Sequence, residues 1–386
     1  MKVTNIIIEV VERTIPDTGM DSDLGRFSGT TEQGLLRILT DEGVEGNCFI
    51  GNFRQGGRGL FRSILDVIKP ELIGHDPADR EWLWNRLGIL ASRKGVTPNA
   101  WAPVDVALWD ISGKVAGLPI YKLLGAYQED TPVYATYPPR HDTPEGYLEE
   151  AKELLAYGFS AYKIHPGTMS TKNVIEAVTL IRNFVGDSMN LMLDPNCGYR
   201  FRKALDIGQA LDANQFYWYE DPVPHYELDS IKELDSRLMV PLCMSDQNPQ
   251  QFYNSANMIR QQSARIVRGT SQKLGITGLK KLCSMAEGFG LNCEIGQAGN
   301  PLLNAANLHV TLSVSNCDYY EYWMPQEAQQ FGLIDDISLN DNCFIEAPMS
   351  PGLGYSIDWD WIKSHKTDSL GAVSYTHLTL PTTPYV

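Results

Sequence analysis

Three acidic residues recur at a constant interval in the second half of this 386-residue sequence. Asp194 follows the apolar run "NLML", Glu220 ends "FYWYE", Asp246 follows "VPLCMS", and successive acids are 26 residues apart. Three carboxylates that share one space repel one another unless they are protonated or bind a cation. Oxygen ligands from Asp and Glu suit Mg²⁺, which completes an octahedron with water or substrate oxygens. The spacing therefore predicts a Mg²⁺ site formed by these three acids.

An alternative is that each acid only caps the helix that follows its strand. The equal interval argues against this, because a structural repeat places side chains at equivalent positions of neighbouring units.

A lysine and a histidine precede the first acid, in "YKIHP". Lys163 and His165 are two residues apart, so on a strand they point to the same side. A desolvated lysine beside a cation has a lowered pKa, on the order of 7–8 in tuned sites, and acts as a base. A histidine titrates near neutral pH and can protonate a leaving group. We expect these catalytic roles, against the alternatives of a surface lysine and a structural histidine that caps the turn.

Two further acids end later apolar runs, Glu294 in "LNCEIG" and Glu321 in "DYYEYW". Glu321 is a candidate catalytic residue near the substrate, or else an acid paired with a neighbouring cation. Glu294 is a candidate for substrate binding, although a buried partner of a nearby amide is the stronger interpretation. Asn196 is a further substrate-binding candidate.

Arginines lie in two glycine-rich segments near the start, "PDTGMDSDLGRFSG" and "GNFRQGGRG". Arg26, and with it Arg54 and Arg58, is expected to bind a substrate carboxylate, because the planar guanidinium donates paired hydrogen bonds. The alternative is that these arginines are solvated loop charges.

Positioning these side chains requires a repeat of strands and helices. Helical stretches with N-caps and glycine stops alternate with short apolar runs, which is typical of parallel β-α-β units. Eight such runs lie between Pro132 and Trp323, enough for a (β/α) barrel with its active site at the carboxyl ends of the strands. We predict a barrel domain over residues 126–344, an α+β capping domain over 1–125, and a segment over 345–372 that returns to the cap. Residues 373–386 resemble a vector-derived or disordered tail.

Composition excludes several classes. The formal net charge of −15 argues against nucleic acid and anionic membrane as partners, because both require a basic surface. No apolar run is long enough to span a bilayer, and acids interrupt the opening stretch "MKVTNIIIEVVERTIP", which favours a strand over a signal peptide. The seven cysteines are scattered without a C-x-x-C pair, so the expected location is the reducing cytoplasm. G-x-S-x-G, P-loop and H-E-x-x-H motifs are absent.

Taken together, the chain resembles the enolase superfamily, in its mandelate racemase and muconate-lactonizing branch. "PVDVALWDISGKVAGLPIYKLLGA" resembles the family's helical passage from the capping domain into the barrel. Lys163 and His165 fall where the family carries its K-x-K base motif, the three acids at the 26-residue interval fall on the metal-ligand strand ends, and Glu321 matches the acid on the last strand. The resemblance implies a modified (β/α)₇β barrel with an N-terminal capping domain, Mg²⁺, a small carboxylate substrate, removal of the proton α to that carboxylate, and a homo-oligomer.

The sequence departs from the family pattern in three ways. The third ligand is Asp246 where the branch mostly has Glu, and the second base-motif residue is His165 rather than Lys. The family's His–Asp dyad is missing, since its positions hold Gly269 and Thr270, and Gly296 and Gln297. Without a second base, dehydration of a sugar acid to a 2-keto-3-deoxy acid by a Mg²⁺-dependent lyase is favoured. A racemase, epimerase or cycloisomerase, and a metal-binding barrel without catalytic activity, are the alternatives.

Overall fold

The computed structural model describes residues 1–17, 20–21, 25–26, 28–54 and 56–372, with no side chains described between 18 and 27. The predicted tail at 373–386 and the side chain of Arg26 therefore lie outside the described residues.

Eight parallel strands form the closed barrel that the sequence predicts. They are β6 (Asp130–Thr136), β7 (Ala161–Ile164), β8 (Asn190–Leu193), β9 (Trp218–Glu220), β10 (Leu242–Met244), β11 (Ile266–Gly269), β12 (Asn292–Ile295) and β13 (Tyr320–Trp323). Neighbours in the chain are neighbours in the sheet, and β13 pairs with β6 to close it. A short strand, β14 (Phe344–Glu346), pairs antiparallel with the amino end of β6.

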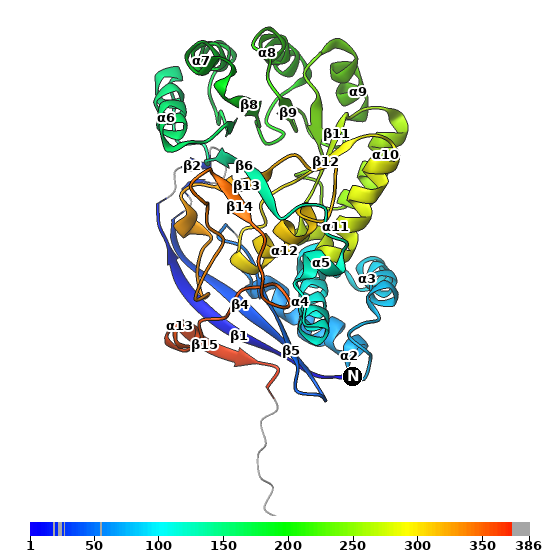
Figure 1. The fold of residues 1–386 in the computed structure, drawn as a ribbon. Coiled ribbons are helices and arrows are strands. Elements are labelled where there is room, and N and C mark those ends of the chain that lie inside the picture. The colour runs from blue at the N-terminus through cyan, green and yellow to red at the C-terminus, as the bar shows by residue number, and fades with distance from the viewer. Residues whose placement is uncertain (18–19, 22–24, 27, 55, 373–386) are drawn as a thin grey trace, which may run out of the picture.

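Helices cover the outside of the barrel between successive strands (Figure 1). They are α6 (Pro144–Tyr157), α7 (Thr171–Val185) with the short η2 (Gly186–Ser188), α8 (Phe201–Ala213), α9 (Leu228–Arg237), α10 (Gln251–Gln261), α11 (Ser271–Gly288) and α12 (Pro301–Thr311). The side chains of Thr143 and Ser170 accept hydrogen bonds from the first turns of α6 and α7, as expected of N-caps. In the described part of the chain, β13 leads only into a short η3 (Gln326–Ala328), which fits the (β/α)₇β form.

The cap is an antiparallel sheet with strand order β15-β1-β4-β5. Its strands are β1 (Val3–Ile15), β4 (Gly29–Thr40), β5 (Glu45–Ile50) and β15 (Lys366–Leu370), and a small separate sheet pairs β2 (Met20–Asp21) with β3 (Gly25–Arg26). The cap helices are α1 (Arg58–Arg62), η1 (Ser63–Ile68), α2 (Lys69–Leu72), α3 (Arg80–Lys94), α4 (Pro98–Ala116) and α5 (Ile120–Leu123), and α13 (Trp359–His365) precedes β15. None of the helices among the described residues combines the length and apolarity needed to cross a membrane.

Helix α4 joins the cap to the barrel. On the cap side it packs on β5 at Gly46, where a Cβ would lie 2.1 Å from the carbonyl oxygen of Ala107. On the barrel side, Trp109 Nε1 donates to Thr277 Oγ1 (2.9 Å), which in turn donates to Asp105 (2.6 Å). The two parts therefore share one buried helix and pack as a unit.

The cap also reaches the carboxyl ends of β12 and β13. The ring of Phe53 lies 5.3 Å from that of Trp323, and Asn300 at the start of α12 donates to the carbonyl oxygens of Phe49 and Gly51. Gly51 and Phe53 of the second glycine-rich segment thus lie at the mouth of the barrel.

Candidate active site

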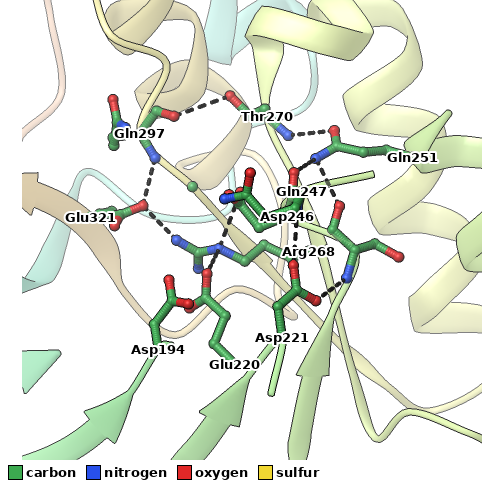
Figure 2. Close-up of polar contacts among 12 residues, drawn as sticks. Asp194, Glu220, Asp221, Asp246, Gln247, Gln251, Arg268, Thr270, Gln297 and Glu321 are labelled. Carbon is green, nitrogen blue, oxygen red and sulfur yellow. Dashed lines mark hydrogen bonds and ion pairs between the residues drawn. The ribbon is translucent and has the colours of Figure 1, made fainter. Parts of the chain in front are cut away.

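The three acids of the 26-residue interval lie at the carboxyl ends of three neighbouring strands. Asp194 directly follows β8, Glu220 is the last residue of β9, and Asp246 comes two residues after β10 (Figure 2). Asp194 and Glu220 are buried, whereas the side chain of Asp246 is 23% exposed. Their positions follow from the short parallel strands, which end at the same edge of the barrel.

Lys163 on β7 is a buried cation surrounded by carboxylates. Its Nζ lies 2.9 Å from Glu321, 3.0 Å from Glu220 and 3.6 Å from Asp194. Burial and the nearby Arg268 act to lower the pKa of Lys163, but these three carboxylates outweigh them and raise it. The lowered pKa was expected of Lys163 beside a bound cation, so that expectation and the role of Lys163 as a base stay predictions.

His165 is fixed through its Nδ1 atom. Nδ1 lies 2.7 Å from the carbonyl oxygen of Tyr137 and 3.1 Å from Thr136 Oγ1, so its proton is donated to that carbonyl. Nε2 lies 3.1 Å from Asp194 Oδ2. Although burial opposes ionisation of Asp194, His165 and Lys163 hold the pKa of its carboxyl well below the usual range. The only ring atom of His165 left to exchange a proton in the site is therefore Nε2.

Arg268 on β11 is a functional candidate that the sequence interpretation missed. Its side chain is 1% exposed, and its Nε lies 2.7 Å from Glu220 Oε1 and 3.5 Å from Asp246 Oδ1. Its Nη2 lies 2.5 Å from Glu321 Oε2 and 2.7 Å from the hydroxyl of Tyr134. The signal was an arginine within the apolar run "ARIVRG", the same signal that identified Lys163.

Glu321 is held between the two buried cations. Besides Lys163 and Arg268, the backbone N–H of Gln297 donates to it at 2.6 Å (Figure 2). Burial alone would favour its neutral form, but the two cations lower the pKa of Glu321 to about 2. This geometry corresponds to the ion-paired acid that the sequence left open, and its catalytic role stays a prediction.

Glu294 faces the opposite end of the barrel. It accepts hydrogen bonds from the backbone N–H of Asp318 (3.1 Å) and from Asn292 Nδ2 (3.3 Å), both at the amino ends of their strands. This matches the amide-partner interpretation, and binding of substrate by Glu294 stays a prediction.

The burial of Glu294 leads to a pH-dependent stability. Burial, and then Asp318, raise the pKa of Glu294 from its ordinary 4.5 to about 7. The folded state therefore retains a proton that the unfolded chain releases, so the free energy of unfolding falls as pH rises from about 4.5 to about 7, by about 3 kcal/mol in total. Glu294→Gln keeps the oxygen that Asp318 needs, and we expect it to remove this fall.

Urea denaturation of the parent and of Glu294→Gln at pH 5 and pH 8 measures the effect. The variant should gain stability relative to the parent at pH 8 but not at pH 5. An equal difference at the two pH values would contradict the assignment.

Of the remaining predicted substrate-binding residues, Asn196 and Arg54 lie at the mouth, whereas Arg58 pairs within the cap. Asn196 donates its backbone N–H to Asp194 Oδ1 (2.7 Å) and accepts from Gln247 Nε2 (3.2 Å). The guanidinium of Arg54 lies 5.6 Å from the ring of Trp323, and Arg58 forms an exposed ion pair with Glu32.

Non-titratable groups occupy the positions of the missing dyad. The backbone N–H of Thr270 donates to Gln251 Oε1 at 3.2 Å (Figure 2), and Gln297 Oε1 accepts from Gln329 Nε2 at 2.9 Å. Proton transfer in the mouth therefore depends on the side that carries Lys163 and His165.

The predicted ligands fit Mg²⁺ by donor chemistry. In the described part of the chain, the carboxyl groups of Asp194, Glu220, Asp246 and Glu321 surround the two buried cations Lys163 and Arg268. Burial raises the pKa of Glu220 well above its ordinary value, and a bound divalent ion would favour its ionised form. Glu220 Oε1 is buried and accepts no well-aligned hydrogen bond from the described residues, so it is available as a ligand. No three Asp, Glu, His or Cys side chains in the described ranges already converge as an ion would require, and Arg268 lies against Glu220 and Asp246.

Comparison with known proteins gives matches over most of the chain. Residues 146–361 match the family profile "Enolase C-terminal domain-like", and residues 27–125 match "Mandelate racemase / muconate lactonizing enzyme, N-terminal domain". Arabinonate dehydratase of Saccharolobus solfataricus is 30% identical over 314 residues, which cover 76% of this chain and 80% of that protein. N-succinyl-L-Arg/Lys racemase of Bacillus cereus is 27% identical over 338 residues, covering 85% and 89%. The structure of D-glucarate dehydratase from Agrobacterium tumefaciens complexed with magnesium is 29% identical, with a TM-score of 0.86 over 95% of this chain and 100% of that one.

Proposed function

Because this chain belongs to the enolase superfamily, in the mandelate racemase and muconate-lactonizing branch, we propose that it dehydrates a sugar acid to a 2-keto-3-deoxy acid with the help of Mg²⁺. The observation that carries the proposal is that the candidate acid–base groups lie on one side of the barrel mouth. Lys163 and His165 lie beside the cluster of carboxyl groups, and the dyad positions hold two glycines, a threonine and a glutamine.

Mg²⁺ would be held by Asp194, Glu220 and Asp246, and when bound it acts as a Lewis acid toward the negative charge that develops on the substrate carboxylate. Lys163 is the fixed cation of the site, because its Nζ already faces three carboxylates. In this role it adds electrostatic stabilisation of the same developing charge.

We assign proton transfer to His165. With the proton of Nδ1 donated to the carbonyl of Tyr137, Nε2 is the ring atom that takes the proton from C2 of the substrate. It does so after it has released the proton that its 3.1 Å contact with Asp194 Oδ2 requires. Asp194, 3.1 Å from Nε2, then stabilises the imidazolium. The imidazolium returns its proton to the C3 hydroxyl, which leaves as water as the C3–O bond breaks, and the resulting enol rearranges to the keto acid. This differs from the roles expected from the sequence, where Lys163 is the base and His165 only the acid.

Racemisation requires a second group that returns the proton to the opposite face of the substrate. Glu321 is engaged by Lys163, Arg268 and the Gln297 N–H, and Glu294 faces the other end of the barrel. Elimination with both groups leaving from one face needs only His165, so dehydration is the better match to these residues.

A sugar acid is the proposed substrate because the mouth combines carboxylate-binding cations with amides that suit hydroxyl groups. Asn196, Gln247 and Gln297 supply those amides, and Arg54 is placed to approach from the cap. Similar proteins named as arabinonate and D-glucarate dehydratases support this class. A homo-oligomer located in the cytoplasm is part of the same proposal.

The test is incubation of the protein and Mg²⁺ with a library of sugar acids in D₂O. We expect one or more acids to give a 2-keto-3-deoxy product, with little deuterium at C2 of the recovered substrate. Recovered substrate that is inverted and deuterated at C2, without a keto acid, would contradict dehydration and favour the racemase. Tight Mg²⁺ binding without turnover of any acid would favour the non-catalytic barrel.

A further inference from the structure

Arg268 is a buried guanidinium that lies against two of the three predicted metal ligands. Its Nε is 2.7 Å from Glu220 Oε1 and 3.5 Å from Asp246 Oδ1 (Figure 2). The third ligand, Asp194, is instead contacted by Lys163 and His165. Two buried cations, Arg268 from β11 and Lys163 from β7, therefore lie among the three acids, and Arg268 is the one in contact with both Glu220 and Asp246.

The surroundings of Arg268 accommodate it closely. At Gly296, a Cβ would lie 3.1 Å from Arg268 Nη2 and 2.9 Å from Asp246 Oδ1, so a larger residue would crowd both side chains. The hydroxyl of Tyr134 and the carboxylate of Glu321 hold Nη2 from the other side. The glycine at a position of the missing dyad therefore provides space that the arginine uses.

The guanidinium is anchored at one end only. Among the described residues, Nη1 and Nε of Arg268 have no hydrogen-bond acceptor, although buried polar groups are normally paired. The contact of Nε with Glu220 is an ion pair without the alignment of a hydrogen bond. Its hold on Glu220 and Asp246 is consequently electrostatic, while its hold on Glu321 and Tyr134 is directional.

We propose that Arg268 is a resident counter-ion that competes with Mg²⁺ for Glu220 and Asp246. The inference rests on the proposed metal-assisted function. Two cations cannot share the same pair of carboxylate oxygens at contact distance without strong repulsion. Arg268 neutralises the two acids while they are free of metal and gives them up when the ion binds, and its bonds to Glu321 and Tyr134 keep it in the site. The site with Arg268 therefore binds Mg²⁺ more weakly than the same three carboxylates would bind it without the arginine.

Isothermal titration of the full chain with MgCl₂ tests this. Arg268→Met keeps the length of the stem and removes the charge, and we expect it to bind Mg²⁺ at least about tenfold more tightly than the parent, roughly 1.4 kcal/mol. Arg265→Met is the control, because Arg265 lies just before the same strand and pairs with Asp235, outside the mouth. The control should bind Mg²⁺ as the parent does.

The outcomes separate this inference from the proposed function. Binding by Arg268→Met but not by the parent would support competition and overturn metal-assisted catalysis. Binding by the parent that is equal or weaker in the variant would overturn competition alone. Absence of binding by both folded proteins would overturn both.

A measurement on the unaltered protein applies if Arg268→Met does not fold. In a spectrum of arginine Nε–H groups, the Arg268 signal is assigned by its absence in Arg268→Lys. It should shift on addition of MgCl₂, whereas the Arg265 signal should not. Saturation with Mg²⁺ that leaves the Arg268 signal unchanged would contradict the proposal.

Discussion

Replacement of His165 by asparagine is expected to lower kcat for the sugar acid by about 10²- to 10⁴-fold, the usual contribution of a positioned acid–base group. Asparagine can still donate to the carbonyl of Tyr137, so the turn after β7 should be retained. What it lacks is a group that accepts a proton from C2 and delivers it to the leaving hydroxyl. Steady-state kinetics with the sugar acid found in the library measures the loss of kcat. Calorimetry should still detect binding of Mg²⁺ to the variant.

His225→Asn is the matched control, because His225 follows β9 in the loop at the mouth but is placed in no catalytic role here. Its kcat should stay within a few-fold of the parent. If His165→Asn retains most of the activity while Lys163→Met has none, the base is Lys163 and the division of roles proposed above is wrong.

The second large effect concerns the metal. Asp194→Asn should weaken Mg²⁺ binding by more than about 100-fold, beyond the 10- to 100-fold loss that follows removal of groups that only orient a ligand. The side chain keeps its shape and still offers an oxygen to the N–H of Asn196, so the circular dichroism spectrum should not change. The substitution also removes one of the negative charges that would attract a divalent ion.

Asp206→Asn on the outer face of α8 is the control for this loss, since Asp206 pairs with a solvated arginine one turn away. Its Mg²⁺ affinity should equal that of the parent. Unaltered affinity in Asp194→Asn would mean that the ion, if it binds, uses other ligands.

The strands could be predicted because their signal is local. Each barrel strand is a short apolar run ended by turn residues, and the acids Asp194 and Glu220 mark where β8 and β9 stop. The N-caps Thr143 and Ser170 were readable for the same reason. The closure of the sheet by β13 on β6 followed from counting eight such runs.

The charges and pKa values in the site depend on residues that are distant in the sequence, so they were predicted less well than the strands. The pKa of Lys163 depends on Glu220 and Glu321, which are distant in sequence. The apolar run around Arg268 indicates that the side chain is buried but not what it contacts. Its importance appears only when β11 brings it against residues from β9 and β13.

The strand β15 has a consequence for synthesis of the protein. Residues Lys366–Leu370 pair antiparallel with Ile8–Val11 of β1, so the sheet nearest the amino end is completed by residues more than 350 positions later. On the ribosome, that edge of β1 stays unpaired while the whole barrel is made. An exposed strand edge can pair with another chain. Translation therefore leaves a period, lasting until Lys366–Leu370 have been made, in which this edge of the nascent cap is open to pairing with another chain.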